Sequence, residues 1–146
     1  MRIALGCDPN ATDLKNLLKE FIPTLGHQVT DFGSDDPLYA NVAVAVAESV
    51  VAGQHDRGVL VCGSGIGVCI AANKVPGAYA ANITNIYQAQ RATQSNNANI
   101  ATFGSLVQGP ELVKALLVEY LSHAWDPDSR SGPKVARIAE YEQGQA

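Results

Sequence analysis

The chain has 146 residues, of which 47% are apolar, and a formal charge of −4 at neutral pH. This length suits one domain (residues 1–146) with a substantial core, and the mild charge without a basic block argues against broad nucleic-acid binding. No apolar run approaches membrane-spanning length, and three cysteines without zinc-ligand spacing argue against disulfides or a structural metal, so we expect a cytoplasmic protein without membrane contact.

Strand-like and helix-like segments alternate along the chain. Short apolar runs predict strands, and apolar residues that recur every three or four positions predict helices. The segment 40–52 alternates Val and Ala as a strand does, but its length and its alanines favour a helix. In chain order we expect strand 2–6, helix 12–26, strand 27–33, helix 40–52, strand 58–62, helix 68–75, strand 78–83, helix 85–97, strand 99–104, helix 111–125, a polar turn at 126–134 and an amphipathic segment at 135–143.

This alternation predicts an α/β fold with a mostly parallel five-stranded sheet and helices on both faces. In such sheets ligands bind beyond the carboxyl ends of the strands. Four loops should meet at that edge, and the third of them is rich in glycine. They are "GCDPNAT" (6–12), "DFGSDDP" (31–37), "CGSGIG" (62–67) and "FGSLVQG" (103–109).

The glycine-rich loop lies in "VLVCGSGIGV" (59–68). Its glycines permit close approach of backbone N–H groups, and a following helix adds the positive end of its dipole, so the loop suits an anion. The spacing matches neither the dinucleotide fingerprint nor a P-loop, which disfavours nucleotide binding. A tight strand-to-helix turn without a ligand is the alternative interpretation.

Cys62 and Ser64 each have a chemical and a structural interpretation. A thiolate beside a helix N-terminus is a useful base, although a free cysteine is also a common buried apolar residue. Cys7 and Cys69 fit that second description. Ser64 either bonds a substrate oxygen or caps the next helix.

Other polar residues are open to two interpretations as well. Asp8 and Asn10 bind a polyol or shape a turn, Asp36 does acid–base chemistry or belongs to a solvated turn, and Asn96 is a ligand or a turn residue. Arg130 and Lys134, with Arg137, form either an anion clamp or a solvated helix face. The histidines, His27, His55 and His123, lie away from the four loops, which disfavours a histidine-based mechanism.

Together these motifs resemble the ribose-5-phosphate isomerase B and galactose-6-phosphate isomerase family. The resemblance runs from "RIALGCD" through "VLVCGSGIGVCIAANKVPG" to "SNNANI" and "FGS". It implies a Rossmann-like three-layer sandwich that acts as a homodimer or a dimer of dimers, with active sites shared between subunits. It also implies that segment 126–146 packs on or reaches into a partner subunit, and that no metal or organic cofactor is used.

The resemblance also assigns roles within the glycine-rich loop. It implies that Cys62 moves a proton between C1 and C2 of a sugar phosphate through a cis-enediolate, and that Ser64, at the place of a usual threonine, assists. The enediolate oxygen would lie in an anion hole made by the N–H groups of Gly63, Ser64, Gly65, Ile66 and Gly67. Both roles are chemically sound, because a positioned thiolate can act as a general base and preorganised N–H donors stabilise developing charge.

The sequence departs from the family at the groups that read the substrate. Pro9 and Leu106 replace a histidine and an arginine that contact phosphate, Ser95 replaces the histidine that opens a furanose ring, and Asp36 replaces a tyrosine. Arg130 remains, and Lys134 substitutes for an arginine. The substrate-binding residues expected from the resemblance are Asp8, Asn10, Asp36, Ser95, Asn96, Arg130 and Lys134.

These departures predict an aldose–ketose isomerase whose substrate is not ribose 5-phosphate. A tetrose or tetrulose phosphate is the first candidate, because a sugar that closes no furanose ring needs no ring-opening group. A smaller unphosphorylated sugar would also suit the lost phosphate ligands. The alternative function is a non-catalytic sugar- or phosphate-binding module on the same scaffold.

Overall fold

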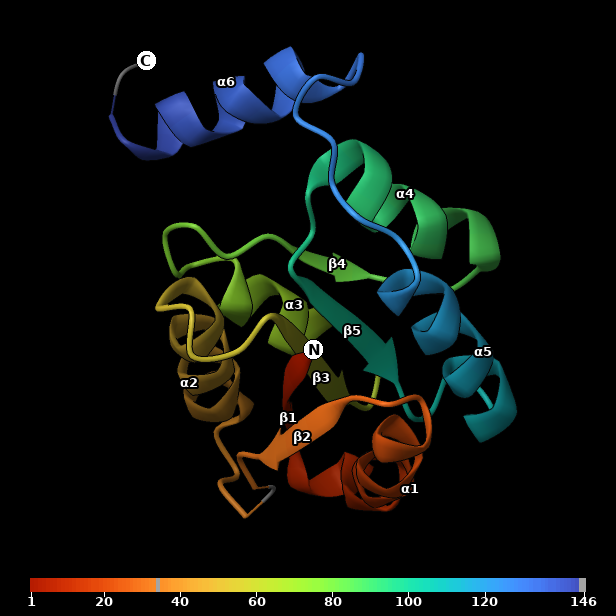
Figure 1. Cartoon of the computed structure of the whole chain (residues 1–146). Coiled ribbons are helices and arrows are strands. Elements are labelled where there is room, and N and C mark those ends of the chain that lie inside the picture. Colours follow the sequence, from red (N-terminus) through yellow and green to blue (C-terminus); the bar gives the residue numbers. More distant parts are fainter. Residues whose placement is uncertain (34, 145–146) are drawn as a thin grey trace.

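Five strands form one sheet in the computed structural model, which describes residues 1–33 and 35–144 (Figure 1). The strand order is β2-β1-β3-β5-β4, and each neighbouring pair is parallel. The predicted α/β fold with a five-stranded sheet is therefore confirmed. The strands are β1 (Arg2–Cys7), β2 (Gln28–Asp31), β3 (Arg57–Cys62), β4 (Ala80–Asn82) and β5 (Ile100–Gly104).

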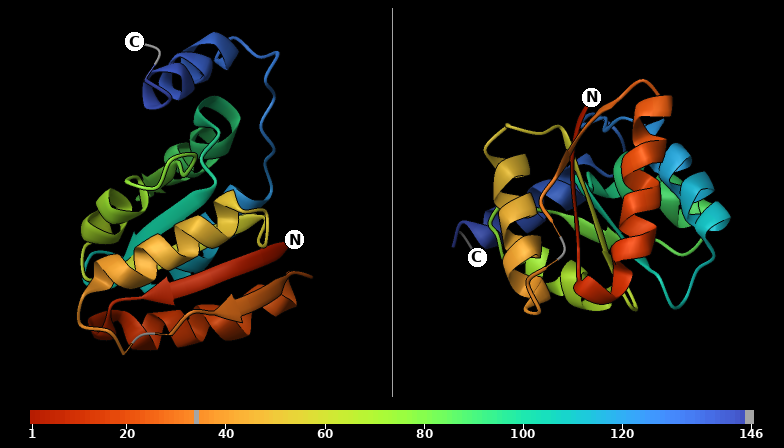
Figure 2. Two further views of the ribbon diagram at one scale, coloured as in Figure 1. Left: turned by 90° about the vertical axis from the view of Figure 1, so that its left-hand side faces the viewer. Right: turned by 90° about the horizontal axis from the view of Figure 1, so that it is seen from below.

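Helices cover both faces of the sheet, as Figure 2 shows from two directions. The helices α1, α4 and α5 pack on one face and α2 and α3 on the other. Each predicted helix is present, and a 3₁₀ turn at Pro9–Ala11 precedes the first. The helices are α1 (Thr12–Thr24), α2 (Tyr39–Val51), α3 (Ile66–Ala72), α4 (Ile86–Asn96), α5 (Pro110–Leu121) and α6 (Gly132–Glu142).

Alternate residues of each central strand build two separate cores. In β1, Ile3 and Leu5 enter the core beneath α1 and α5, whereas Ala4 enters the core beneath α2. Gly6 also faces α2, and a Cβ at this position would lie 2.6 Å from Cγ2 of Val42. The missing side chain thus lets α2 pack close to the end of β1, the point at which the first loop begins.

The order in which strands are added to the sheet changes direction at β1: β2 lies on one side of β1, and β3 lies on its other side. The loop after β1 leads to α1 on one face, and the loop after β3 leads to α3 on the other. Loops that part in this way leave a crevice beyond the carboxyl ends of the two strands. Both the loop of Asp8 and the loop of Cys62 border this crevice.

The helix α5 is shorter than the sequence predicted. It ends at Leu121, although apolar residues continue to Trp125. The Ser122 hydroxyl donates to the Glu119 carbonyl (2.8 Å), and Asp126 precedes Pro127, where helical geometry is disfavoured. An extended connection from residue 122 therefore leads to α6.

The helix α6 lies beyond the amino ends of β4 and β5 (Figures 1 and 2). Val135 is its one buried residue among those described, and the Glu142 carboxylate accepts the Gly77 N–H at 2.9 Å. Ile138 and Tyr141 are 53% and 70% exposed. Residues 145–146 of the predicted partner-contacting segment lie outside the described residues. No helix of the described chain is both long and apolar enough to span a membrane.

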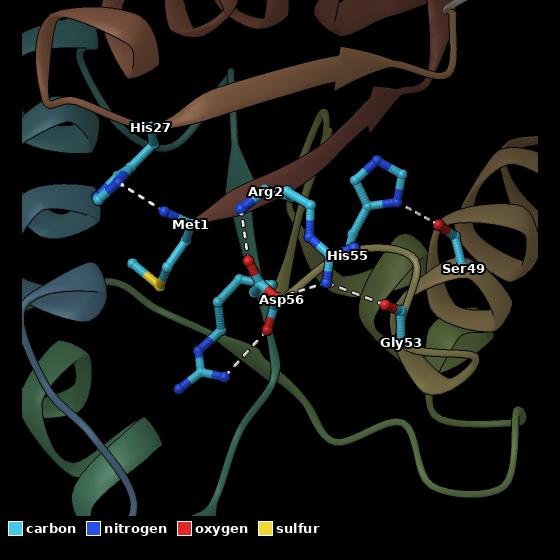
Figure 3. Close-up of polar contacts among 8 residues, drawn as sticks. Met1, Arg2, His27, Ser49, Gly53, His55 and Asp56 are labelled. Carbon is cyan, nitrogen blue, oxygen red and sulfur yellow. Dashed lines mark hydrogen bonds and ion pairs between the residues drawn. The ribbon is translucent and has the colours of Figure 1, made fainter.

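Two carboxylates form hydrogen bonds and ion pairs at the ends of the strands. Asp56 accepts both the Arg2 guanidinium (2.8 Å) and the Arg2 backbone N–H (2.6 Å), which joins the starts of β1 and β3 (Figure 3). These bonds lower the pKa of Asp56 to about 2. Asp31 ends β2. Partial burial raises the pKa of its carboxyl, but hydrogen bonds from Lys15, Gly33 and Lys19 outweigh burial and lower it to about 2.

We predict acid sensitivity from these two carboxylates. Because their pKa values are lower in the folded chain than in the unfolded one, they stabilise the fold fully above about pH 4. That contribution is lost as the pH falls from about 4 toward 2. The measurement is the free energy of unfolding by urea at a series of pH values. In Asp56→Asn the loss over this range should be smaller than in the wild type, and an equal loss would contradict the assignment for Asp56.

Candidate active site

A cavity of about 440 Å³ opens at the crevice between β1 and β3. Its walls come from the loop after β1, the glycine-rich loop after β3 and the first turns of α2 and α3. The sequence predicted that these loops converge, and the cavity lies where they do. The lining residues are Asp8, Asn10, Tyr39, Cys62, Gly63, Ser64, Ile66, Gly67 and Ile70.

The end of β5 holds the glycine-rich turn in place. The Ser105 N–H donates to the Cys62 carbonyl (2.9 Å), the Leu106 N–H to the Gly63 carbonyl (3.0 Å) and the Thr102 hydroxyl to the Gly65 carbonyl (2.8 Å). With these carbonyls bonded to β5 and its loop, N–H groups are the backbone atoms that the turn can offer to a ligand.

Gly65 is required by both its conformation and its neighbours. Its φ is +78°, a region that residues with a side chain rarely adopt, and it directly precedes α3. A Cβ there would lie 2.5 Å from Oδ1 of Asn82 and 2.9 Å from the Phe103 carbonyl carbon. Any side chain at Gly65 would therefore push the turn away from β5.

Cys62 is the cysteine that lines this cavity. Its side chain is 6% exposed, and its Sγ accepts the Gly65 N–H at 3.1 Å. Cys69 instead donates its thiol proton to the Ala80 carbonyl (3.3 Å), and burial raises the pKa of the Cys69 thiol. Cys7 is fully buried in the core beneath α1. Cys7 is buried as the sequence predicted, Cys69 is only partly buried, and Cys62 alone of the three lines the cavity of the candidate site.

Ser64 and Asp8 line the cavity and also shape the backbone around it. The Ser64 hydroxyl accepts the Ile66 N–H at 3.2 Å, although the N-cap residue of α3 is Gly65. The Asp8 carboxylate accepts the Asn10 N–H at 2.8 Å, and the Asp8 N–H donates to the Val61 carbonyl at 2.9 Å. Both side chains thus shape their loops and also line the cavity.

Asp36 organises the start of α2. Its carboxylate accepts the Leu38 N–H and the Asn41 side-chain amide, both at 2.8 Å, and these bonds lower the pKa of the carboxyl. The cavity wall nearby comes instead from Tyr39, a residue that the sequence analysis missed. The Tyr39 ring lies over Gly67, where a Cβ would be 2.7 Å from its Cζ. The sequence feature that points to Tyr39 is an aromatic residue in the first turn of a helix, directly after a loop at the carboxyl ends of the strands.

Leu106 borders the same region from the loop after β5. It is 85% exposed, and its Cδ1 would be 3.4 Å from a Cβ placed on Gly63. With Asn10 it also lines a second cavity of about 290 Å³ on the α1 side. This exposed leucine makes the edge of the site next to β5 apolar.

The remaining predicted substrate ligands lie elsewhere in the chain. Ser95 and Asn96 are at the end of α4, and Asn96 donates to the Arg91 carbonyl at 2.9 Å. Arg130 and Lys134 are exposed, on the connection before α6 and on α6 itself. None of the four is among the residues that line the Cys62 cavity. A single chain therefore does not bring the predicted set together.

Asp8 is the one ionisable carboxylate among the lining residues, and none of the lining residues is cationic. In the part of the chain that is described, no group of three or more His, Cys, Asp or Glu could hold a metal ion. The cavity thus offers a thiol, a hydroxyl, a carboxylate and backbone N–H groups. This set suits proton transfer on a polyhydroxy compound better than it suits the binding of a phosphate dianion.

Comparison with known proteins agrees with this chemistry. The family model described as Ribose/Galactose Isomerase matches residues 3–138. The D-erythrulose-4-phosphate isomerase of Pectobacterium atrosepticum is 42% identical, over 97% of this chain and 95% of the relative. The ribose-5-phosphate isomerase B of Listeria innocua is also 42% identical, over 98% of both chains.

A solved structure shares the fold over its whole length. Ribose-5-phosphate isomerase B of Clostridium thermocellum superposes with a TM-score of 0.92 at 36% identity, covering all of both chains. Its likeness extends the sequence match to the arrangement of the sheet and helices. The chain therefore belongs to the ribose/galactose isomerase family and is an aldose–ketose isomerase, as its sequence predicted.

Proposed function

We propose that this protein interconverts the aldose and ketose forms of a four-carbon sugar phosphate, with Cys62 as the base. One observation carries the proposal. The Cys62 sulfur lies at the wall of the cavity, bonded to the Gly65 N–H, in a turn whose carbonyls are held by β5. A base and a set of N–H donors therefore meet at one point of the cavity.

The proton transfer is balanced within the site. The Cys62 thiolate removes the proton from the carbon next to the carbonyl, and the electron pair of that C–H bond forms the double bond of a cis-enediolate. Negative charge gathers on the former carbonyl oxygen, where N–H groups of the turn at 63–67 donate to it. The Cys62 thiol then returns the proton to the neighbouring carbon, while a proton moves between the two oxygens with the Ser64 hydroxyl in reach.

Two features of the site favour this assignment for Cys62. A thiolate accepts an N–H hydrogen bond more strongly than a neutral thiol does, and the Gly65 N–H already points at the sulfur at 3.1 Å. The Asp8 carboxylate and the Asn10 amide line the same cavity and can bond hydroxyl groups of a sugar. The cavity thus provides separate places for the reacting carbons and for the hydroxyls that orient them.

The substrate assignment follows from chemistry at Ser95 and from the relatives. A four-carbon sugar phosphorylated on its terminal oxygen has no free hydroxyl with which to close a five-membered ring. It stays open, so a serine can stand where the resemblance expects a ring-opening histidine. The erythrulose phosphate isomerase of Pectobacterium atrosepticum supports this choice at 42% identity.

A phosphorylated substrate also implies a second copy of the chain. The cavity lacks a cation among its lining residues, and Ser95, Asn96, Arg130 and Lys134 of the same chain do not line it. We propose a homodimer or a dimer of dimers, in which α4 and the segment from residue 126 onward complete the cavity of a partner. Exposed apolar residues around the cavity, Leu38, Ile66, Ile70, Leu106 and Val107, are consistent with such a contact.

We predict that Cys62→Ala abolishes the reaction but keeps ligand binding. The rate at which solvent deuterium exchanges into C2 of erythrose 4-phosphate, followed by NMR, should fall by roughly 10²- to 10⁴-fold because the base is gone. Cys69→Ala is the matched control and should keep wild-type exchange. Thermal stabilisation by 3-phosphoglycerate, whose carboxylate mimics the enediolate of a tetrose phosphate, should persist in Cys62→Ala. Wild-type protein that binds this mimic but exchanges no proton in any tetrose phosphate would instead indicate a non-catalytic binding module.

We further predict that substrate choice can be moved toward five carbons. The double variant Ser95→His, Leu106→Arg adds an imidazole for ring opening and a guanidinium beside the cavity. The ratio of kcat/KM for ribose 5-phosphate to that for erythrose 4-phosphate should rise by about tenfold or more. Ser95→Ala, Leu106→Gln supplies the same positions without the two functional groups and should leave the ratio low. An unchanged ratio in the first variant would remove the link between these positions and carbon number.

A further inference from the structure

Arg91 is a cation whose contacts within residues 1–33 and 35–144 are to neutral groups. It lies on α4, and its guanidinium donates to the Gln94 side-chain carbonyl and approaches the Ser95 hydroxyl at 3.5 Å. The face of the Tyr87 ring is 5.8 Å from the guanidinium carbon. Carboxylates pair with Arg2, Lys15, Lys19, Lys114 and Arg137, whereas Arg57, Lys74, Arg130 and Lys134, like Arg91, form no ion pair within the described residues.

The surroundings of Arg91 suit an anion. Its Nε is buried without a hydrogen-bond partner in the described chain, an arrangement that costs free energy. The side chain also lines a cavity of about 230 Å³ with the amides of Asn82, Gln88 and Asn96. The Gln88 carbonyl accepts both the Thr84 N–H and the Thr84 hydroxyl, so its NH₂ group remains as a donor.

The Cys62 cavity, by contrast, lacks positive charge. A sugar phosphate brings a charge of about −2 at neutral pH, and the residues lining that cavity contribute no positive charge. Arg91 and Cys62 line different cavities, and β5 lies between β3 and β4 in the sheet. A second copy of the chain would supply the Cys62 cavity with the cation that its own lining residues lack.

Ser95 links Arg91 to the proposed active site. The two residues are one helical turn apart on α4, and the Arg91 guanidinium is in reach of the Ser95 hydroxyl. Any arrangement that brings Ser95 to the Cys62 cavity of a partner therefore brings Arg91 with it. A serine is small, so it leaves the guanidinium open to a ligand where a larger side chain would cover it.

We propose that Arg91, beside Ser95, binds the phosphate of the four-carbon substrate in the cavity of a second copy. This inference rests on the proposed function. The phosphate of a tetrose is one carbon closer to the reacting carbons than that of a pentose, so its cation must also lie closer. A guanidinium binds phosphate through two parallel N–H bonds, which makes Arg91 a residue that sets substrate length as well as charge.

Steady-state kinetics with erythrose 4-phosphate test this role. Arg91→Gln should raise KM by about tenfold or more and change kcat by less than about threefold, because binding of the phosphate is lost while Cys62 and its turn are intact. Arg91→Lys keeps the charge and should recover part of the loss. Lys114→Gln, which removes a charge from α5, is the control and should match the wild type. An unchanged KM in Arg91→Gln, or a loss confined to kcat, would overturn the proposal.

Mixing two variants tests whether Arg91 acts on the partner's site. Cys62→Ala and Arg91→Gln are unfolded and refolded together, and activity is assayed at a substrate concentration well below the KM of Arg91→Gln. Random pairing makes half of the dimers mixed, and one site of each mixed dimer holds both wild-type residues. Activity should thus rise to about a quarter of wild type. Activity equal to the mean of the two variants would place Arg91 in its own chain's site and overturn the proposal.

The failure of this inference is distinguishable from failure of the proposed function. Wild-type protein that converts no tetrose phosphate would refute both. Wild-type protein that converts erythrose 4-phosphate, together with an Arg91→Gln variant of the same KM, would refute the role of Arg91 alone. Circular dichroism and the molecular mass in solution establish that each variant folds and assembles, and Arg91→Lys gives a second readout in which the helix surface changes least.

Discussion

The close packing of the Cys62–Gly67 turn against the end of β5 is the constraint on which the site depends. Three backbone carbonyls of this turn are bonded to residues of β5 or its loop, and Gly65 fits only because it has no side chain. These bonds fix the direction of the N–H groups and the position of the Cys62 sulfur together. A hydrogen-bond donor held in place before the reaction stabilises new charge without the cost of reorganisation.

The same packing explains why the site needs so few side chains. Backbone N–H groups are the donors nearest the sulfur, and the neighbouring residues, Ser64 and Asp8, spend part of their hydrogen-bonding capacity on the loops that carry them. Tyr39 covers Gly67 from α2 and completes the wall. The chemistry thus rests on the geometry of the main chain, which the fold determines, while the recognition of the sugar rests on side chains from other elements.

Much of the fold could be predicted from the sequence because each strand and helix carries its own pattern. The alternation of buried strands with amphipathic helices was enough for the parallel sheet, and the loop at 62–67 was identified from its glycines. Tyr39 and Arg91 were not identified, because their roles depend on tertiary neighbours. Tyr39 contacts Gly67, and the proposal for Arg91 rests on the neutral groups around its guanidinium. The end of α5 was also misplaced, since apolar periodicity continues past Leu121 although Pro127 follows.

In the proposed site the base and the cation lie on different elements, and this has a consequence for how such an enzyme acquires a new substrate. Cys62 and its turn are tied to β5, so substitutions there disturb the reaction and the fold at once. Ser95 and Arg91 lie on one face of α4, and Leu106 is 85% exposed, so these positions can change with little effect on the sheet. A change in carbon number moves the phosphate relative to the reacting carbons and leaves those carbons where they are. Substitutions outside the turn are therefore enough to bind the phosphate at its new position, and the geometry of proton transfer is kept.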